Sequence, residues 1–176
     1  PWAVNGLTYP AERLPLGIWM TEGGSSALGA ELSAAIVREA LAAWTEVGCS
    51  DFEYVYEGTI DAGFGDDGLN VLSWEDETWT WGDGVLGMTA TRFELMDGLP
   101  SPAGADILFN GVDYLWVEGV GDLYVTPATV NAGSVVTHEL GHVAGMDHSY
   151  TDVAATMFFA YISGDWQRTV SGDDRR

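Results

Sequence analysis

Residues 135–159, VVTHELGHVAGMDHSYTDVAATMFF, contain all three histidines of this chain of 176 residues. His138 and His142 are four positions apart in an apolar run, so on a helix both imidazoles project from one face. Thr129 and Asn131 are alternative caps for the start of this helix. Gly145 accepts a positive φ and predicts a sharp exit from it. The returning chain then presents His148, six residues after the second histidine.

Glu139 stands directly beside the first histidine, which completes the spacing H-E-x-x-H. In zinc hydrolases with this spacing, the two imidazoles bind the metal and the glutamate acts on the metal-bound water. A catalytic zinc needs a third protein ligand and an open position. The full pattern fixes five residues, and its chance occurrence in a chain this short is on the order of one in 10⁵. The sequence therefore predicts one zinc ion held by His138, His142 and His148, with Glu139 as general base.

The pattern HELGHVAGMDH with a methionine downstream resembles the metzincin clan of zinc endopeptidases. Ser149 after the third histidine is similar to the matrixins, which are the matrix metalloproteinases and their bacterial relatives, and ATMFFAY at 155–161 resembles the matrixin Met-turn. This resemblance implies that Met157 forms the floor beneath the zinc. It also implies that Tyr161 borders the pocket for the side chain after the scissile bond. Phe159 departs from the family pattern, because it stands in the place of a proline.

Three other segments resemble matrixins more loosely. GVLGMTATRF at 84–93 is similar to the edge strand that pairs with an extended substrate. ADILFNG at 105–111 is similar to the next strand of bacterial members, which implies a bacterial-type member. TVSGDD at 169–174 is similar to the start of the last helix, cut short here, in which Asp173 and Asp174 would brace the Met-turn. The edge-strand resemblance implies substrate contacts at Val85, Leu86, Gly87, Met88 and Thr89.

The apolar pattern of the whole chain predicts an α/β (α+β) fold. Residues 29–48 have apolar side chains at helical spacing and predict a long amphipathic helix. The strands are predicted at 13–20, 52–58, 68–76, 84–95 and 104–111. The strand–helix–strand opening favours a twisted sheet with at least one parallel pair. We expect one metzincin-like catalytic domain over 1–176: a five-stranded mixed sheet, a backing helix and an active-site helix to about residue 145, then an irregular subdomain at about 146–176.

The chain carries 27 acidic residues against six arginines, with a formal net charge of −21. Charge of this sign repels nucleic acid and anionic lipid, which excludes both as main partners, and no apolar run has the length of a membrane helix. The acid excess has two compatible interpretations, a strongly charged solvated surface and carboxylates gathered into structural calcium sites. Residues 61–70, DAGFGDDGLN, form the richest Asp/Gly loop, but they lack the spacing of an EF-hand and are equally explained as a solvated turn.

We expect a secreted, monomeric protease that acts on proteins or peptides. No histidine remains for a second, structural zinc of the kind in many animal matrixins. Cys49 cannot form a disulfide within the chain, and we expect it to pair with a cysteine beyond Arg176. The Trp-rich segment 74–84 either shapes the cleft or covers the core, and we favour the second.

Two other classes of function stay open. One is a zinc-binding recognition module without turnover, against which the intact Glu139 argues. The other is an acidic, calcium-dependent adhesion or matrix protein, which leaves the ordered histidines unexplained.

Overall fold

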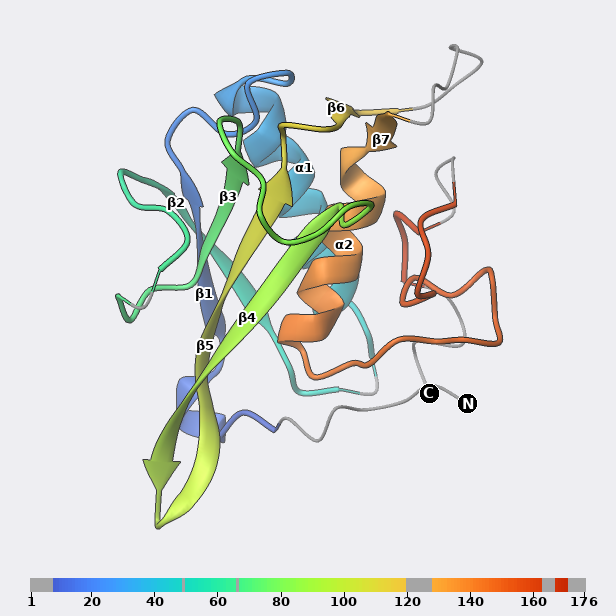
Figure 1. The fold of residues 1–176 in the computed structure, drawn as a ribbon. Coiled ribbons are helices and arrows are strands. Elements are labelled where there is room, and N and C mark those ends of the chain that lie inside the picture. The colour runs from blue at the N-terminus through green and yellow to red at the C-terminus, as the bar shows by residue number, and fades with distance from the viewer. Residues whose placement is uncertain (1–7, 49, 66, 120–127, 163–166, 171–176) are drawn as a thin grey trace.

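The computed structural model describes residues 8–48, 50–65, 67–119, 128–162 and 167–170, in which a twisted sheet carries two long helices on one face (Figure 1). The main sheet has five strands in the order β2-β1-β3-β5-β4. Neighbours among β2, β1, β3 and β5 are parallel, and β4 joins β5 in antiparallel orientation at the edge. The strands are β1 (Leu16–Thr21), β2 (Tyr54–Ile60), β3 (Val71–Glu75), β4 (Gly87–Met96) and β5 (Leu99–Asn110). The expected mixed five-stranded sheet is confirmed.

Helices α1 (Ala30–Thr45) and α2 (Ala132–Val143) pack against the sheet and against each other. The apolar face of α1 is buried at Ile36, Val37, Ala40 and Trp44. Leu32 is half-buried, and Val47, which follows the end of the helix, is buried as well. The Trp44 indole donates a hydrogen bond of 2.8 Å to the Thr137 carbonyl and so ties the backing helix to α2. Within the described residues, no helix is long and apolar enough to cross a membrane.

The start of α2 distinguishes between the two caps expected from the sequence. Thr129 does not cap the helix, because it begins β7 (Thr129–Asn131), which pairs in parallel with β6 (Leu115–Val117). Asn131 is the N-cap, and its side-chain oxygen accepts a hydrogen bond of 3.0 Å from the Ser134 amide. The small β6–β7 sheet and the short 3₁₀ helix η1 (Ala11–Arg13) were not expected from the sequence, because three residues are too few to show a period.

Strand β5 begins at Leu99, five residues earlier than the sequence predicted. Pro100 and Pro102 argue against a strand there, because a proline has no amide hydrogen to donate to a ladder. The strand continues because only β4 pairs with this part of β5 among the described strands, while β3 pairs with it from Ile107 onward. The result is a long β4–β5 hairpin that projects from the body of the molecule (Figure 1).

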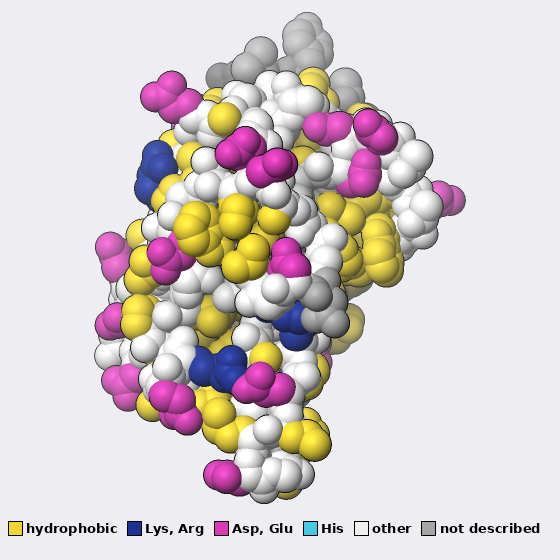
Figure 2. Space-filling model, turned by 90° about the vertical axis from the view of Figure 1, so that its left-hand side faces the viewer, with side chains coloured by type: hydrophobic (Ala, Val, Ile, Leu, Met, Phe, Trp, Pro, Cys, Tyr) yellow, Lys and Arg dark blue, Asp and Glu magenta, His cyan; other side chains and the backbone are white. Residues whose placement is uncertain are grey.

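The Asp/Gly loop, residues 61–70, and the Trp-rich segment, residues 74–84, lie over the sheet face opposite the helices. Figure 2 shows this side of the molecule, where apolar side chains lie among scattered acidic ones. The Phe64 and Trp81 rings meet edge to face with centroids 6.0 Å apart. Asp106 is buried and accepts hydrogen bonds from the Val71 and Gly65 amides, at 2.9 and 3.2 Å, which holds the Asp/Gly loop on the sheet. Trp79 and Trp81 do not line the two cavities at the histidines, whereas Gly84, at the end of the Trp-rich segment, lines the second of them.

Candidate active site

The three histidines come together at the end of α2 next to β4. The Nε2 atom of His148 lies 3.1 Å from that of His142 and 3.2 Å from that of His138. Imidazole nitrogens around a tetrahedral zinc, with bonds of about 2.0–2.1 Å, lie about 3.3 Å apart. The spacing therefore fits one zinc ion. In the described part of the chain, these are the only His, Cys, Asp or Glu side chains that gather in a group of three able to hold a metal.

Backbone carbonyls fix the orientation of the two helical histidines. His138 Nδ1 lies 2.8 Å from the Thr156 carbonyl oxygen, and His142 Nδ1 lies 2.9 Å from that of Met146. Because a carbonyl oxygen only accepts, each Nδ1 carries the proton and each Nε2 presents its lone pair to the metal. Burial lowers the pKa of His148, and the charges of the other two histidines act in the same direction. The neutral form that binds metal is thus favoured.

The turn after α2 brings the third histidine back toward the helix. Gly145 has φ +95°, its amide donates 3.1 Å to the His142 carbonyl, and the Met146 amide donates 2.9 Å to the Gly141 carbonyl. These two bonds form a Schellman motif, which ends a helix with a left-handed residue. Ser149 then donates its amide to the Met157 carbonyl at 2.7 Å. Gly145 thus ends the helix in the left-handed conformation, and the loop carrying the third histidine is held against the Met-turn.

Met157, which the family resemblance predicts to lie beneath the zinc, is fully buried beside α2. Its sulfur faces Gly141, where a Cβ atom would overlap it and would also lie 2.7 Å from a ring atom of Trp44. A glycine at this helical position therefore lets the Met-turn lie close to the metal-binding helix.

Replacing Gly141 by alanine is expected to lower the free energy of unfolding by about 1–3 kcal/mol, because the added methyl group overpacks the contact between α2 and the Met-turn. Gly133→Ala is the matched control on the same helix. Its Cβ would lie 3.2 Å from the side chain of Arg168, which is flexible. The control should change stability by less than about 1 kcal/mol, since alanine favours the helix. Urea unfolding of both variants measures the difference, and equal effects would contradict the packing argument.

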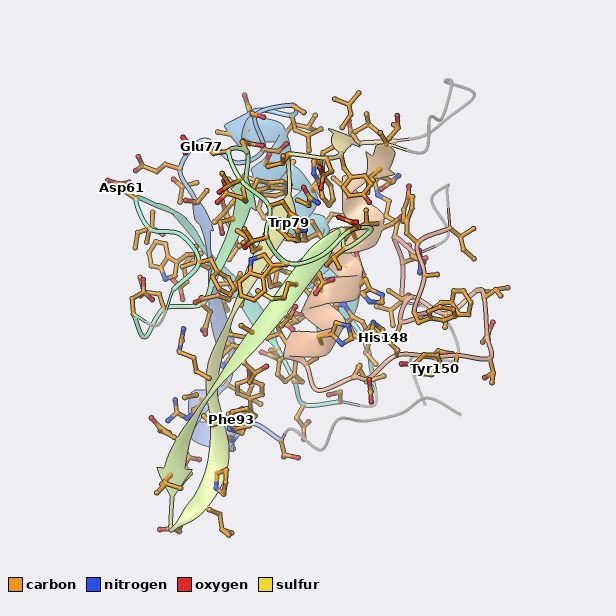
Figure 3. The ribbon with its side chains drawn as sticks, viewed as in Figure 1. Asp61, Glu77, Trp79, Phe93, His148 and Tyr150 are labelled. Atoms are coloured by element: carbon orange, nitrogen blue, oxygen red, sulfur yellow. The ribbon has the colours of Figure 1, made fainter. Side chains whose placement is uncertain are left out.

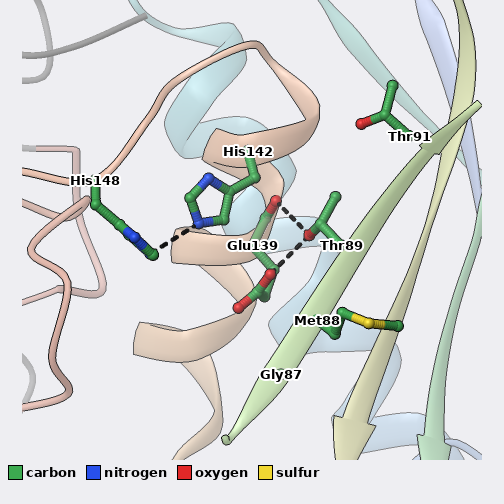
Figure 4. A pocket seen from close by; sticks show the side chains of 7 residues that line it. All are labelled: Gly87, Met88, Thr89, Thr91, Glu139, His142 and His148. Atoms are coloured by element: carbon green, nitrogen blue, oxygen red, sulfur yellow. Dashed lines mark hydrogen bonds between the residues drawn. The ribbon is translucent and has the colours of Figure 1, made fainter. Parts of the chain in front are cut away.

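Glu139 points into the cavity next to the histidines, between α2 and β4 (Figure 4). The Thr89 hydroxyl donates a hydrogen bond of 2.7 Å to its Oε2 atom. Gly87 makes room for it, because a Cβ there would lie 3.1 Å from the Glu139 Cγ. Burial raises the pKa of Glu139, while the charge of His142 and the Thr89 hydrogen bond oppose the rise. A buried carboxylate with a raised pKa is suited to accept a proton and pass it on.

Two cavities flank the histidines. The first, of about 310 Å³, lies over Glu139 and is lined by Gly87, Met88 and Thr89. This cavity is open to solvent on one side, next to His142 and His148. A catalytic zinc, unlike a structural one, needs such an open position for water or substrate. The second, of about 480 Å³, lies between residues 84–87 and the wall at 158–161. Figure 3 shows His148 and Tyr150 on the C-terminal loops that face α2.

Three further residues expected at the site line the second cavity. Val85, Leu86 and Tyr161 line it, and the Tyr161 hydroxyl accepts a hydrogen bond of 2.8 Å from the Asn131 amide at the start of α2. Gln167, which the sequence did not indicate, also lines this cavity; it is buried and donates to the Phe158 and Ala160 carbonyls at 3.3 and 3.4 Å. No local pattern marks such a residue. Asp173, Asp174 and Cys49, for which roles were expected, lie outside the described residues.

Comparison with known proteins points to one family. The family model described as Matrixin matches residues 18–176, from the first strand of the sheet through the histidine cluster. No curated protein matches the chain.

Proposed function

Because this chain belongs to the matrixin family, it is a zinc-dependent endopeptidase whose metal ligands are His138, His142 and His148, and we propose that Glu139 is its general base. One observation carries the proposal. The Glu139 carboxylate, held by the Thr89 hydroxyl, lines the same cavity as His142 and His148.

Zinc held by His138, His142 and His148 would supply Lewis-acid polarisation and would lower the pKa of a water bound to it towards about 7. Glu139 takes a proton from the attacking water and delivers it to the leaving amine. The Thr89 hydroxyl, bonded to Oε2, limits the rotation of the carboxylate and leaves Oε1 for this transfer. His138 and His142 are kept in orientation by the carbonyls of Thr156 and Met146, so the ligand set is formed before substrate arrives.

We further propose that the substrate lies extended along residues 85–89 and adds a strand to the edge of the sheet. The position of β4 at the edge, next to Glu139, supports this. The side chain after the scissile bond would enter the cavity of about 480 Å³ that Tyr161 and Phe159 line. The cavity has a partly apolar lining, so apolar side chains should be preferred there.

The broader setting is proposed from the family resemblance and the composition. We propose a secreted, bacterial-type matrixin that acts as a monomer, with a single catalytic domain divided near residue 145. The cleft lies where the two proposed parts meet, since α2 precedes this point and His148 follows it. Calcium at the Asp/Gly loop and the bracing role of Asp173 and Asp174 stay predictions.

The test of the proposed function is cleavage of an internally quenched peptide library with and without a zinc chelator. We expect cleavage within the peptides, its loss on chelation and its return when zinc is restored. A protein that binds zinc through the three histidines but cleaves nothing would be the recognition module considered above. Cleavage that persists without metal would contradict a zinc mechanism.

A further inference from the structure

The projecting end of the β4–β5 hairpin, residues 93–102, is called the arm here. Phe93, Leu95 and Leu99 on it have exposed fractions of 55%, 75% and 70%. Among the other large apolar side chains in the described part of the chain, only those of Tyr150 and Val153 are more exposed than Phe93. Apolar side chains this exposed on a projecting hairpin indicate an interaction surface.

The arm continues the row of side chains that lines the catalytic cleft. Thr89 and Thr91 point from β4 toward the cavity, and Thr89 contacts Glu139 (Figure 4). Side chains alternate along a strand, so Phe93 and Leu95 extend the same row. The one irregularity of the ladder does not change this alternation, because the extra residue, between Pro102 and Gly104, belongs to β5.

Leu99 belongs to the opposite face of the arm. It pairs with Met96, whereas Leu95 pairs with Pro100, and neighbouring positions on a strand face opposite sides. The arm therefore offers two similarly exposed leucines, one in the row of the cleft and one outside it. Figure 3 shows Phe93 on the hairpin at some distance from His148, between the cleft and the tip.

The backbone of β4 is also open to a partner. Among the described strands it pairs only with β5, so its outer amides and carbonyls face away from the sheet from Gly87 to Met96. An exposed strand edge of this length accepts an added strand. The unpaired backbone edge of β4 and the row of side chains that ends in Phe93 and Leu95 thus both extend from the active site onto the arm.

We propose that the arm binds an apolar segment of the protein substrate on the N-terminal side of the scissile bond. This inference rests on the proposed function, in which the cavity at Tyr161 takes the side chain after that bond. That cavity lies at the start of β4, so the residues before the bond run toward the arm. Leu95 is six residues beyond Thr89, about 20 Å along a strand, so about six substrate residues are needed to reach it.

The charge of the chain limits the chemistry of this segment. Asp97 lies at the tip of the arm and the whole chain carries −21, whereas the carboxylate of Glu94, between Phe93 and Leu95, forms an ion pair with Arg13. A segment of alternating apolar and neutral or basic residues fits the arm, whereas an acidic segment would be repelled.

The experiment compares two peptides with the same sequence around the scissile bond and the same net charge. The short peptide begins three residues before the bond, and the long peptide adds five alternating Leu and Thr residues. We expect kcat/KM for the long peptide to exceed that for the short one by about tenfold, from partial burial of two apolar side chains. The variant carrying Phe93→Ser and Leu95→Ser should bring this ratio close to one. The matched variant Leu99→Ser should keep it.

A binding measurement separates this inference from the proposed function. In the Glu139→Ala background, fluorescence anisotropy should show the labelled long peptide binding about tenfold more weakly after Phe93→Ser and Leu95→Ser, whether or not the parent protein cleaves. An unchanged ratio and affinity in the double variant would overturn the inference, as would an equal loss in Leu99→Ser. The inference would also be overturned if the parent protein formed a concentration-dependent dimer that the double variant abolishes, while the ratio of kcat/KM between the long and short peptides stayed unchanged. The arm would then bind a second copy of the chain. Absence of short-peptide cleavage would count against the proposed function alone.

Discussion

Glu139→Gln is expected to lower kcat/KM for peptide cleavage by about 10³-fold, within the range of about 10²–10⁴ that a positioned general base contributes. Glutamine has the shape of glutamate and keeps an oxygen for the Thr89 hydroxyl, so the cavity should stay intact. It cannot take a proton from water at neutral pH. Glu139 is not among the metal ligands, so the zinc content should not change. Steady-state kinetics and elemental analysis of the same preparation measure both quantities.

Glu46→Gln is the matched control for this variant, because Glu46 is exposed just after α1 and the change in charge is the same. It should leave both zinc content and kcat/KM within about twofold, as expected for a surface substitution away from the site. Comparable cleavage by Glu139→Gln and the parent protein would remove Glu139 from the mechanism. Loss of zinc from that variant would show that the carboxylate supports the metal site instead.

The histidine segment could be predicted because its constraints are local. His138 and His142 share a helix face by spacing alone, and Gly145 marks the end of that helix by its backbone freedom. The structure reproduces both features, with the turn at Gly145. The five strands were found for the same reason, since each alternates or runs apolar over a few residues.

Contacts between distant segments could not be predicted in this way. Thr89 and Glu139 are fifty residues apart, and their hydrogen bond depends on how closely β4 approaches α2. The arm was missed because Pro100 and Pro102 argue against a strand, and only the pairing with β4 shows that they are tolerated. Gln167 supports the wall of the second cavity through two backbone carbonyls, which no sequence period reports.

His148→Ala is expected to weaken zinc binding by more than about 100-fold. Loss of a residue that only hydrogen-bonds to a metal ligand already costs about 10–100-fold in metal affinity, and His148 is itself a ligand. His148 is the ligand supplied by the returning loop, and the two helical ligands alone leave the metal half coordinated. Competition with a chromophoric chelator measures the affinity. Cleavage should be lost at zinc concentrations that saturate the parent protein, and the rise in melting temperature on zinc addition should shrink accordingly.

Tyr150→Ala provides the control, because the Tyr150 ring lies 6.1 Å from the His148 ring and is 68% exposed. It removes a larger side chain from the same loop without removing a ligand, so zinc affinity should stay within about tenfold. The comparison distinguishes coordination from a general loosening of the loop, which Ser149 ties to Met157 in both variants. Unchanged zinc affinity in His148→Ala would exclude it as a ligand and leave the convergence of the three imidazoles without a metal-binding role.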